Sequence, residues 1–282
     1  MQIAQIIKNY PLQLTESSSP RLDVEILLSH AIQKDRSFMY AWDTYELKEI
    51  EMNIFEKLFE ERLRGKPIAY LVKKREFWSM DLLVNEHTLI PRPETELLVE
   101  VALNVLPQNG TVFDLGTGSG CISLAIKKER PDCRIIGIDN SLKALEIAQQ
   151  NAQNLNLNIE WLESDWFSNI NCKADMIISN PPYIATHDPH LRQGDVRFEP
   201  QSALVSGKEG LNDLFYLIDH ARYFLNPNGW LWLEHGFNQG LVINSLLKSH
   251  GYTNIKTYKD SNGQDRVSGG KFLLSEKFNL LS

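Results

Sequence analysis

The sequence has few cysteines and no long apolar run. Cys121, Cys133 and Cys172 are the only cysteines among 282 residues, an odd number at wide spacing. A disulfide framework or a zinc site needs paired or clustered cysteines, so we expect three reduced thiols and no metal site. No stretch approaches the roughly 20 apolar residues that cross a bilayer, so we expect no membrane segment.

An excess of positive charge is also missing. The chain carries 29 Lys and Arg against 36 Asp and Glu, a net charge of −7. Up to residue 75 there are 12 basic and 11 acidic residues, and beyond it 17 and 25. Neither part has the basic excess of a protein held mainly by phosphates, so we expect no direct contact with nucleic acid.

The N-terminal segment lacks the features of a leader. It contains one basic residue, Lys8, no long apolar core and no small-residue cleavage site. We therefore expect a cytoplasmic protein. With 43% hydrophobic and 23% charged residues, the composition is that of a globular chain, and its length predicts about two domains.

The first 75 residues read as a small helical domain. Apolar residues recur at helical spacing in 20–32 and again in 46–63, where charges occupy the other side. Residues 76–92 change to short apolar runs, which predicts a linker with a strand or hairpin. Residues 93–282 then form the expected catalytic domain, starting with a helix at Pro93.

Strands and helices alternate after Gly110. Apolar strands separated by helices predict an α/β fold with a mostly parallel, doubly wound sheet and an antiparallel last strand. The expected strands cover residues 111–115, 133–139, 158–163, 174–179 and 229–235, with a final pair around Ile255 and Phe272, and the expected helices cover 119–128, 141–155, 211–225 and 240–251.

The first strand runs into a glycine-rich loop, Gly116-Thr117-Gly118-Ser119-Gly120. Glycines allow the backbone to turn tightly and approach a ligand, and a helix N-terminus follows directly. A tight strand-to-helix turn without a ligand is the alternative. Cys121 stands where a dinucleotide fingerprint would have its last glycine, which argues against NAD.

Acidic residues follow the next two strands. Asp139 comes 19 residues after Gly120, and its carboxylate can accept both hydroxyls of a ribose, although a helix N-cap is the alternative. Asp165 can accept from an adenine amino group while Trp166 or Phe167 packs on the ring. Taken together with the glycine loop, these residues favour an adenosine-type cofactor.

The fourth strand ends in Asn180-Pro181-Pro182-Tyr183. Two prolines fix φ and carry no N–H, so a rigid turn can aim the Asn180 side-chain oxygen and nearby carbonyls at one point. Two acceptors suit the two hydrogens of a planar amino group, and Tyr183 can supply a flat wall. A proline-rich loop with an asparagine turn is the alternative reading.

These motifs resemble class I S-adenosylmethionine-dependent methyltransferases, and more closely the protein-(glutamine-N5) methyltransferases of the HemK/PrmC type. The resemblance covers nearly the whole chain, and Lys73 departs from it, since relatives usually have glycine there. The segments that carry it are 65–78, 89–96, the DLGTGSG and NPPYI motifs, 188–204, 233–236 and 265–272.

The resemblance implies a Rossmann-like methyltransferase domain that transfers a methyl group from S-adenosylmethionine to a glutamine side-chain amide. It implies that the glutamine belongs to the Gly-Gly-Gln motif of class 1 peptide chain release factors, which the helical domain helps to engage. Carried over by position, Gly116–Gly120, Asp139, Trp166 and Asn180 line the cofactor, and Asn180–Tyr183 bind the glutamine, with Asn180, Pro181 and Tyr183 catalytic.

Other functions stay open at this point. A DNA or RNA amino-methyltransferase of the adenine N6 type uses the same turn on a flipped base, and an adenosine-binding adaptor would not need it. Residues 62–75 carry six basic and no acidic side chains, either a solvated helix end or a docking patch for an acidic partner. We expect a monomer.

Overall fold

The computed structural model describes residues 1–273. The chain forms two compact units. The first contains Met1–Lys74, Val84–Glu86 and Pro189–Glu199, and the remainder forms the second. The domain boundaries predicted at 75/76 and 92/93 stay predictions, and residues 274–282 of the predicted catalytic domain lie outside the described part.

The helical unit is built around one apolar core. Phe55 and Phe59 of its longest helix stack at 5.8 Å between ring centroids, and the edge of Tyr10 contacts both rings. This packing follows from apolar residues at helical spacing on one side of each helix. The helices are α1 (Ile3–Asn9), α2 (Pro20–Ile32), α3 (Arg36–Ala41), α4 (Glu49–Leu63) and α5 (Ile68–Val72), with a 3-10 helix at Tyr10–Gln13.

Arg62 of the basic stretch points into this unit. Its guanidinium group donates to buried Asp23 at 2.8 Å and to Asp195 at 3.1 Å. Asp195 belongs to Pro189–Glu199, the segment that follows the Asn-Pro-Pro-Tyr turn in sequence and joins the helical unit. Arg62 is therefore an internal ion-pair partner and is unavailable to a docking patch.

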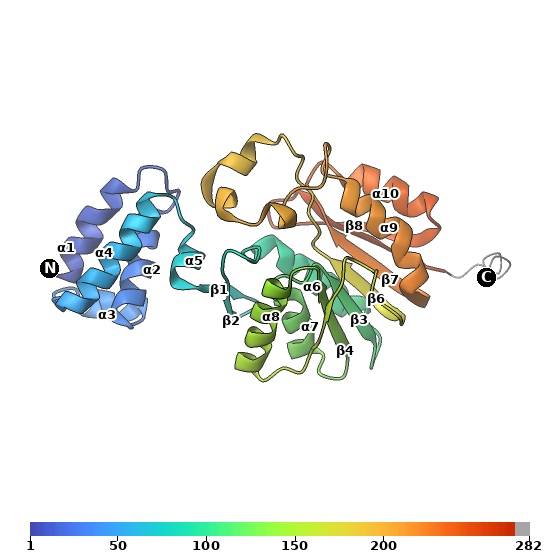
Figure 1. The fold of residues 1–282 in the computed structure, drawn as a ribbon, viewed down its shortest axis with the longest axis horizontal. Helices are drawn as coiled ribbons and strands as arrows, with labels where there is room; N and C mark the ends of the chain where they lie inside the picture. Colours follow the sequence, from blue (N-terminus) through green and yellow to red (C-terminus); the bar gives the residue numbers. More distant parts are fainter. Residues whose placement is uncertain (274–282) are drawn as a thin grey trace. The chain divides into compact units, whose positions relative to one another are not determined.

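The second unit contains a seven-stranded sheet, drawn from teal to red in Figure 1, with strand order β5-β4-β3-β6-β7-β9-β8. The first five strands in this order pair in parallel, and β9 is antiparallel to both of its neighbours. The predicted α/β fold with an antiparallel last strand is confirmed. The strands are β3 (Thr111–Leu115), β4 (Arg134–Asp139), β5 (Glu160–Glu163), β6 (Ala174–Ser179), β7 (Leu225–Glu234), β8 (Tyr252–Lys259) and β9 (Asp265–Phe272).

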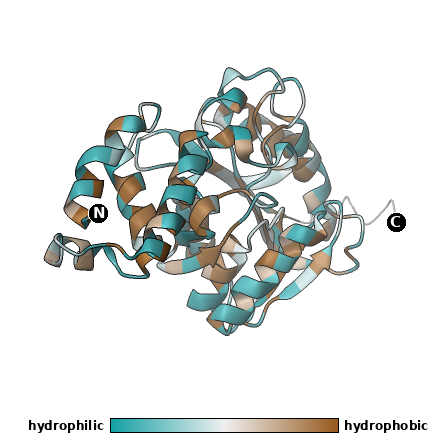
Figure 2. Ribbon diagram, turned by 60° about the vertical axis from the view of Figure 1, so that its left-hand side comes forward, coloured by the Kyte–Doolittle hydropathy of each residue, from teal (hydrophilic) through white to brown (hydrophobic). Residues whose placement is uncertain are grey.

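Helices cover both faces of the sheet, which is why its strands are apolar on both sides. Val112 and Met176 pack in one core, whereas their neighbours Phe113 and Ile177 pack in the other. Each covering helix carries hydrophobic and hydrophilic residues (Figure 2). Helices α6 (Glu96–Val105), α7 (Cys121–Glu129) and α8 (Leu142–Leu155) contribute to the first core, and α9 (Asn212–Phe224) and α10 (Gly240–Ser249) to the second.

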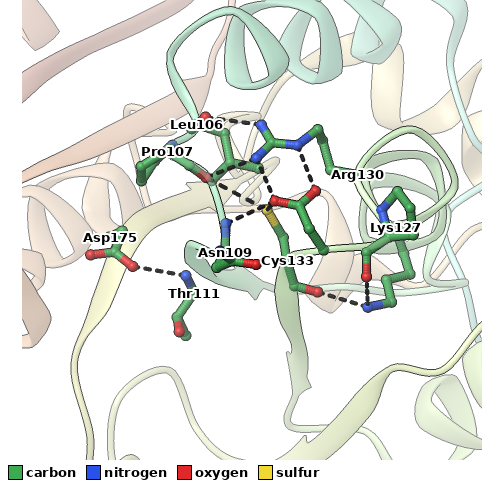
Figure 3. Close-up of polar contacts among 10 residues, drawn as sticks. Leu106, Pro107, Asn109, Thr111, Lys127, Arg130, Cys133 and Asp175 are labelled. Carbon is green, nitrogen blue, oxygen red and sulfur yellow. Dashed lines mark hydrogen bonds and ion pairs between the residues drawn. The ribbon is translucent and has the colours of Figure 1, made fainter.

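Hydrogen bonds connect the segments at the amino ends of strands β3, β4 and β6 (Figure 3). Arg130 donates to the carbonyls of Leu106 and Pro107 at 2.9 Å, and Asp175 accepts the N–H of Thr111 at 2.8 Å. Cys133 is a buried free thiol beside this network. These contacts fix the amino ends of β3, β4 and β6, so the opposite ends are positioned by a rigid sheet.

No helix within residues 1–273 is long and apolar enough to cross a bilayer. A short hairpin, β1 (Lys74–Phe77) and β2 (Met80–Leu83), follows the helices, and its first strand begins two residues before the predicted linker of residues 76–92. The 3-10 helix Pro93–Thr95 then leads into α6, with Pro93 in its first turn.

Lys73 ends helix α5 in the left-handed region, with φ of 57° and ψ of 29°. Glycine adopts this conformation without a steric cost, whereas a residue with a Cβ is strained there. The position at which the resemblance predicts glycine, and at which this chain has Lys73, is therefore one at which the backbone favours glycine.

We expect the Lys73→Gly substitution to stabilise the helical unit by about 0.5–1 kcal/mol, because the relief of strain exceeds the added flexibility of the unfolded chain. Chemical denaturation followed by circular dichroism would measure the difference. Lys74→Gly is the matched control: Lys74 lies in strand β1, so glycine there should destabilise. Equal effects at both positions would contradict the interpretation.

Candidate functional site

The parallel register aligns the carboxyl ends of four strands. Leu115 at the end of β3 pairs with Ile138 of β4 and with Ser179 of β6, and Ser179 pairs with Leu233 of β7. The residues that follow these positions therefore lie along one edge of the sheet, where open α/β sheets bind ligands. They include Gly116, Asp139, Asn180 and Glu234.

The glycine loop turns sharply at this edge. Gly116, Gly118 and Gly120 all have positive φ, of 72°, 56° and 81°. A Cβ added at Gly118 would meet no described atom within 4 Å, whereas one at Gly120 would lie 3.0 Å from the Trp161 ring. Gly118 thus leaves open space for a ligand, and Gly120 allows the close packing of the loop on its neighbours.

Asp114, the residue before the last of β3, contacts this loop through Thr117, and no motif spacing in the sequence identifies it as a site residue. Its Oδ2 accepts from the Thr117 hydroxyl at 2.6 Å and from the backbone and hydroxyl of Ser123 at 3.1 and 2.7 Å. Its Oδ1 is buried without a hydrogen-bond partner within residues 1–273. Burial raises the pKa of the Asp114 carboxyl group to about 6.

Asp139 closes the other side of the loop. Its Oδ2 accepts the Gly118 N–H at 2.9 Å, and its Oδ1 accepts the Ser141 N–H at 2.9 Å. The helix N-cap is Ser141, whose hydroxyl accepts from Ala144 N–H, so the alternative role considered for Asp139 is taken by Ser141. Burial raises the pKa of Asp139, and the N–H groups it accepts from counteract this.

Trp166 and Phe167 have different environments. Phe167 is buried in the core and stacks on Phe224 at 4.6 Å between centroids. Trp166 is half-buried with a positive φ of 47°, and its ring lies 3.6 Å from the Cβ position of Gly116. Trp166 is therefore the ring that borders the glycine loop, and Asp165 beside it is exposed.

The Asn180 side chain is oriented by a hydrogen bond from its Nδ2 to the Thr95 hydroxyl oxygen, at 3.2 Å. Thr95 is buried at the start of α6. With Nδ2 facing Thr95, the Asn180 Oδ1 points away from it as an acceptor. Pro181 and Pro182 follow directly and supply no N–H that competes for this oxygen.

Tyr183 is held by contacts to its phenol group and its backbone. Its hydroxyl donates to Glu234 Oε1 at 3.3 Å. Its carbonyl accepts from Gln239 Nε2 at 3.1 Å, and Gln239 also donates to the carbonyl of Gly210. A Cβ at Gly210 would lie 2.2 Å from the Tyr183 carbonyl oxygen, so the backbone approaches too closely there for any other residue.

Glu234 is fully buried at the end of β7. Its Oε2 has no hydrogen-bond partner in the described part of the chain. Burial raises the pKa of its carboxyl group to about 7, while Thr95, Arg266 and Tyr183 act in the opposite direction. A buried carboxyl group with a raised pKa beside Tyr183 is an arrangement typical of functional sites.

His235 does not offer a free base. Its Nδ1 contacts the Gly236 carbonyl and its Nε2 the Ser268 hydroxyl, both at 2.8 Å. Within residues 1–273, no group of three or more His, Cys, Asp or Glu side chains is placed to hold a metal ion.

Comparison with known proteins gives matches over most of the chain. The family model described as PrmC N-terminal domain matches residues 5–72, and that described as Methyltransferase small domain matches residues 93–196. The chain is 46% identical over 267 residues to the release factor glutamine methyltransferase of Aliivibrio fischeri, covering 93% of this chain and 94% of that protein. It is 46% identical over 263 residues to that of Escherichia coli strain K12, covering 92% and 95%.

Solved structures share the fold. A Pyrococcus furiosus methyltransferase superposes with a TM-score of 0.54 at 20% identity, covering 76% of this chain and 96% of that chain. A T. thermophilus 16S rRNA methyltransferase in complex with AdoMet and guanosine gives a TM-score of 0.52 at 18% identity, covering 71% and 49%. At these identities the two structures support the fold alone.

The buried Asp114 generates a pH-dependent prediction. Between about pH 4 and pH 6 the folded protein keeps a proton on Asp114 that the unfolded chain has released, so the stability from this group falls as pH rises through that window. Asparagine can accept the same three hydrogen bonds and cannot ionise. The Asp114→Asn variant should therefore gain melting temperature relative to the parent protein as pH rises from about 4.5 to 7.

Thermal unfolding of both proteins across this pH range would measure the gain. Asp165→Asn is the control, because Asp165 is exposed and should show no such trend. A melting-temperature difference that stays constant from acid to neutral pH would show that Asp114 does not titrate in this window.

Proposed function

Because the chain belongs to the release factor glutamine methyltransferase family, we propose that it transfers the methyl group of S-adenosylmethionine to the side-chain amide nitrogen N5 of a glutamine. The proposed acceptor is the glutamine in the Gly-Gly-Gln motif of class 1 peptide chain release factors. The observation that carries the proposal is the Asn180 side chain, whose amide donates to Thr95 so that its oxygen is left as an acceptor beside the glycine loop.

The residues around the glycine loop fit the proposed cofactor. The open space at Gly118 suits close approach of a ligand to the backbone, and the unpartnered Oδ1 of Asp114 suits a cationic amino group. Asp139 and Asp165 would accept from the ribose and the adenine, and Trp166 would border the ring. S-Adenosylmethionine supplies a methyl carbon bound to a positively charged sulfur, which makes that carbon electrophilic.

The proposed role of the turn is to position a weak nucleophile. The lone pair of an amide nitrogen is delocalised into its carbonyl group, so the nitrogen attacks poorly unless it is held close and in line. The oxygens of Asn180 and Pro181 would each accept one of its two hydrogens, and Tyr183 would pack on the amide plane. Positioning of this kind is worth up to about 7–11 kcal/mol in favourable cases, and the two acceptors also stabilise the N–H groups as they become more acidic.

An amino group of a nucleic-acid base has the same two hydrogens, so the turn alone does not distinguish the two acceptors. Two observations favour the protein substrate. The net charge is −7, and the chain is 46% identical, over more than 90% of its length, to relatives named as release factor glutamine methyltransferases. Parallel assays with labelled S-adenosylmethionine and a release factor, duplex DNA or tRNA would separate these acceptors. Transfer to nucleic acid alone would contradict the proposal.

We expect Asn180→Ala to lower kcat for release-factor methylation at least about 10²–10³-fold, because one of the two proposed acceptors is removed. Calorimetric titration should still detect binding of S-adenosylmethionine. Asn140→Ala is a matched control, since Asn140 follows β4 at the same edge and has no proposed role in transfer. An unchanged kcat in Asn180→Ala would refute the assignment of the turn.

A further inference from the structure

Gln239 is a buried side chain whose hydrogen bonds all go to the backbone of other segments. Its Nε2 donates to the carbonyls of Tyr183 and Gly210, both at 3.1 Å. Its Oε1 accepts the N–H of Gly236 at 2.8 Å. Gln239 is the N-cap residue of α10, shortly after the end of β7. One amide group therefore connects the Asn-Pro-Pro-Tyr turn, the loop at Gly210 and the segment that follows β7.

The neighbours of Gln239 allow only one orientation of its amide group. A backbone N–H can only donate, and a carbonyl oxygen can only accept. Turned over, the amide would place its oxygen against the two carbonyls and its NH₂ group against the Gly236 N–H. The Gln239 N–H also donates to the Gly236 carbonyl at 2.9 Å, which closes a tight turn. The NH₂ group is therefore directed at the Tyr183 carbonyl.

The contact to Tyr183 lies where the rigidity of the Asn-Pro-Pro-Tyr turn ends. Pro181 and Pro182 have a fixed φ, whereas Tyr183 has two soft backbone dihedrals. A hydrogen bond to the Tyr183 carbonyl fixes the peptide plane that follows, and with it the ψ of Tyr183. The other side of this peptide bond is held as well, because the Ile184 N–H donates to the Leu204 carbonyl at 2.8 Å.

The ring of Tyr183 is held from its other end by Glu234. The phenol hydroxyl donates to Glu234 Oε1 at 3.3 Å. Glu234 ends β7 and Gln239 caps α10, so one short segment contacts both the phenol and the backbone of Tyr183. With both ends restrained, the ring has little freedom to leave its place beside the turn.

We propose that Gln239 is a positioning residue for methyl transfer, which sets the place of the Tyr183 ring through the backbone. This inference rests on the proposed function, in which that ring packs on the plane of the acceptor amide. A shift of about 1 Å in a positioning group can cost about 10²-fold in rate. A glutamine that served packing alone would lower stability when replaced and leave the rate of the folded enzyme unchanged.

Gln239→Glu tests the inference with little change in shape, because a carboxylate can only accept hydrogen bonds and both donors are lost. Measured below the melting temperature of the variant, kcat for release-factor methylation should fall about 10- to 100-fold. KM for the release factor and the affinity for S-adenosylmethionine should change less than about threefold, a range that is small beside that loss. Asn238→Asp is the matched control, since Asn238 is exposed, gains the same charge and should keep the parent kcat.

Gln239→Met gives the second arm, because it keeps the length of the side chain without donors or charge. Its kcat should fall to a similar degree, and it decides the question if Gln239→Glu does not fold. Adding Gln239→Met to Tyr183→Ala should cause no further loss, since the ring through which Gln239 acts is already absent. Losses that multiply, or an unchanged kcat in the Gln239 variants, would overturn the inference.

Fluorine NMR without substrate separates this inference from the proposed function. Incorporation of 3-fluorotyrosine gives a resonance for each tyrosine, and the Tyr183→Phe spectrum identifies that of Tyr183. This resonance should shift or broaden in Gln239→Met and stay in place in Asn238→Asp. Such a result supports the positioning role even where the parent protein fails to methylate a release factor, and an unmoved resonance in Gln239→Met refutes it.

Discussion

The hydrogen bond from Asn180 to Thr95 decides which end of one amide group faces the proposed acceptor. It forms because the sheet brings the carboxyl end of β6 beside the start of α6, and the register of β6 with β7 places Glu234 level with Asn180. The apolar strands, the helices on both faces and the fixed amino ends of the strands all serve to keep these few polar groups in place. A small slip of register would separate them.

The site combines two buried carboxyl groups, and burial raises the pKa of Asp114 to about 6 and that of Glu234 to about 7. Asp114 lies under the glycine loop and Glu234 under the Asn-Pro-Pro-Tyr turn, and each keeps one oxygen without a partner within residues 1–273. Burying a carboxyl group in this way costs stability. The cost is reasonable at a site that we propose to attract a positively charged cofactor and to orient a neutral amide. Buried Asp23 differs, because Arg62 donates to it at 2.8 Å and compensates its charge.

The sequence predicts the fold and the linear motifs well, because both depend on local spacing. The glycine loop, Asp139, Trp166 and the turn at Asn180 all follow strands that periodicity identifies. The sequence does not identify Thr95, Glu234 and Gln239, because each acts through a hydrogen bond to a residue 51 to 85 positions away. Pro189–Glu199 joins the helical unit, where Asp195 accepts from Arg62 and Arg197 donates to the Arg64 carbonyl, pairings 133 residues apart that no spacing rule reveals.

Lys73 shows how a departure from a family pattern can be explained in physical terms. The backbone at the end of α5 needs positive φ, and lysine adopts it at a cost that glycine would avoid. Neighbouring contacts hold Lys73 in this conformation. Leu71 of α5 packs into the helical core before it, and β1 begins directly after it at Lys74. The same reasoning applies to the Asn-Pro-Pro-Tyr turn, where two prolines fix φ and so lower the conformational entropy that ordering the turn would otherwise cost.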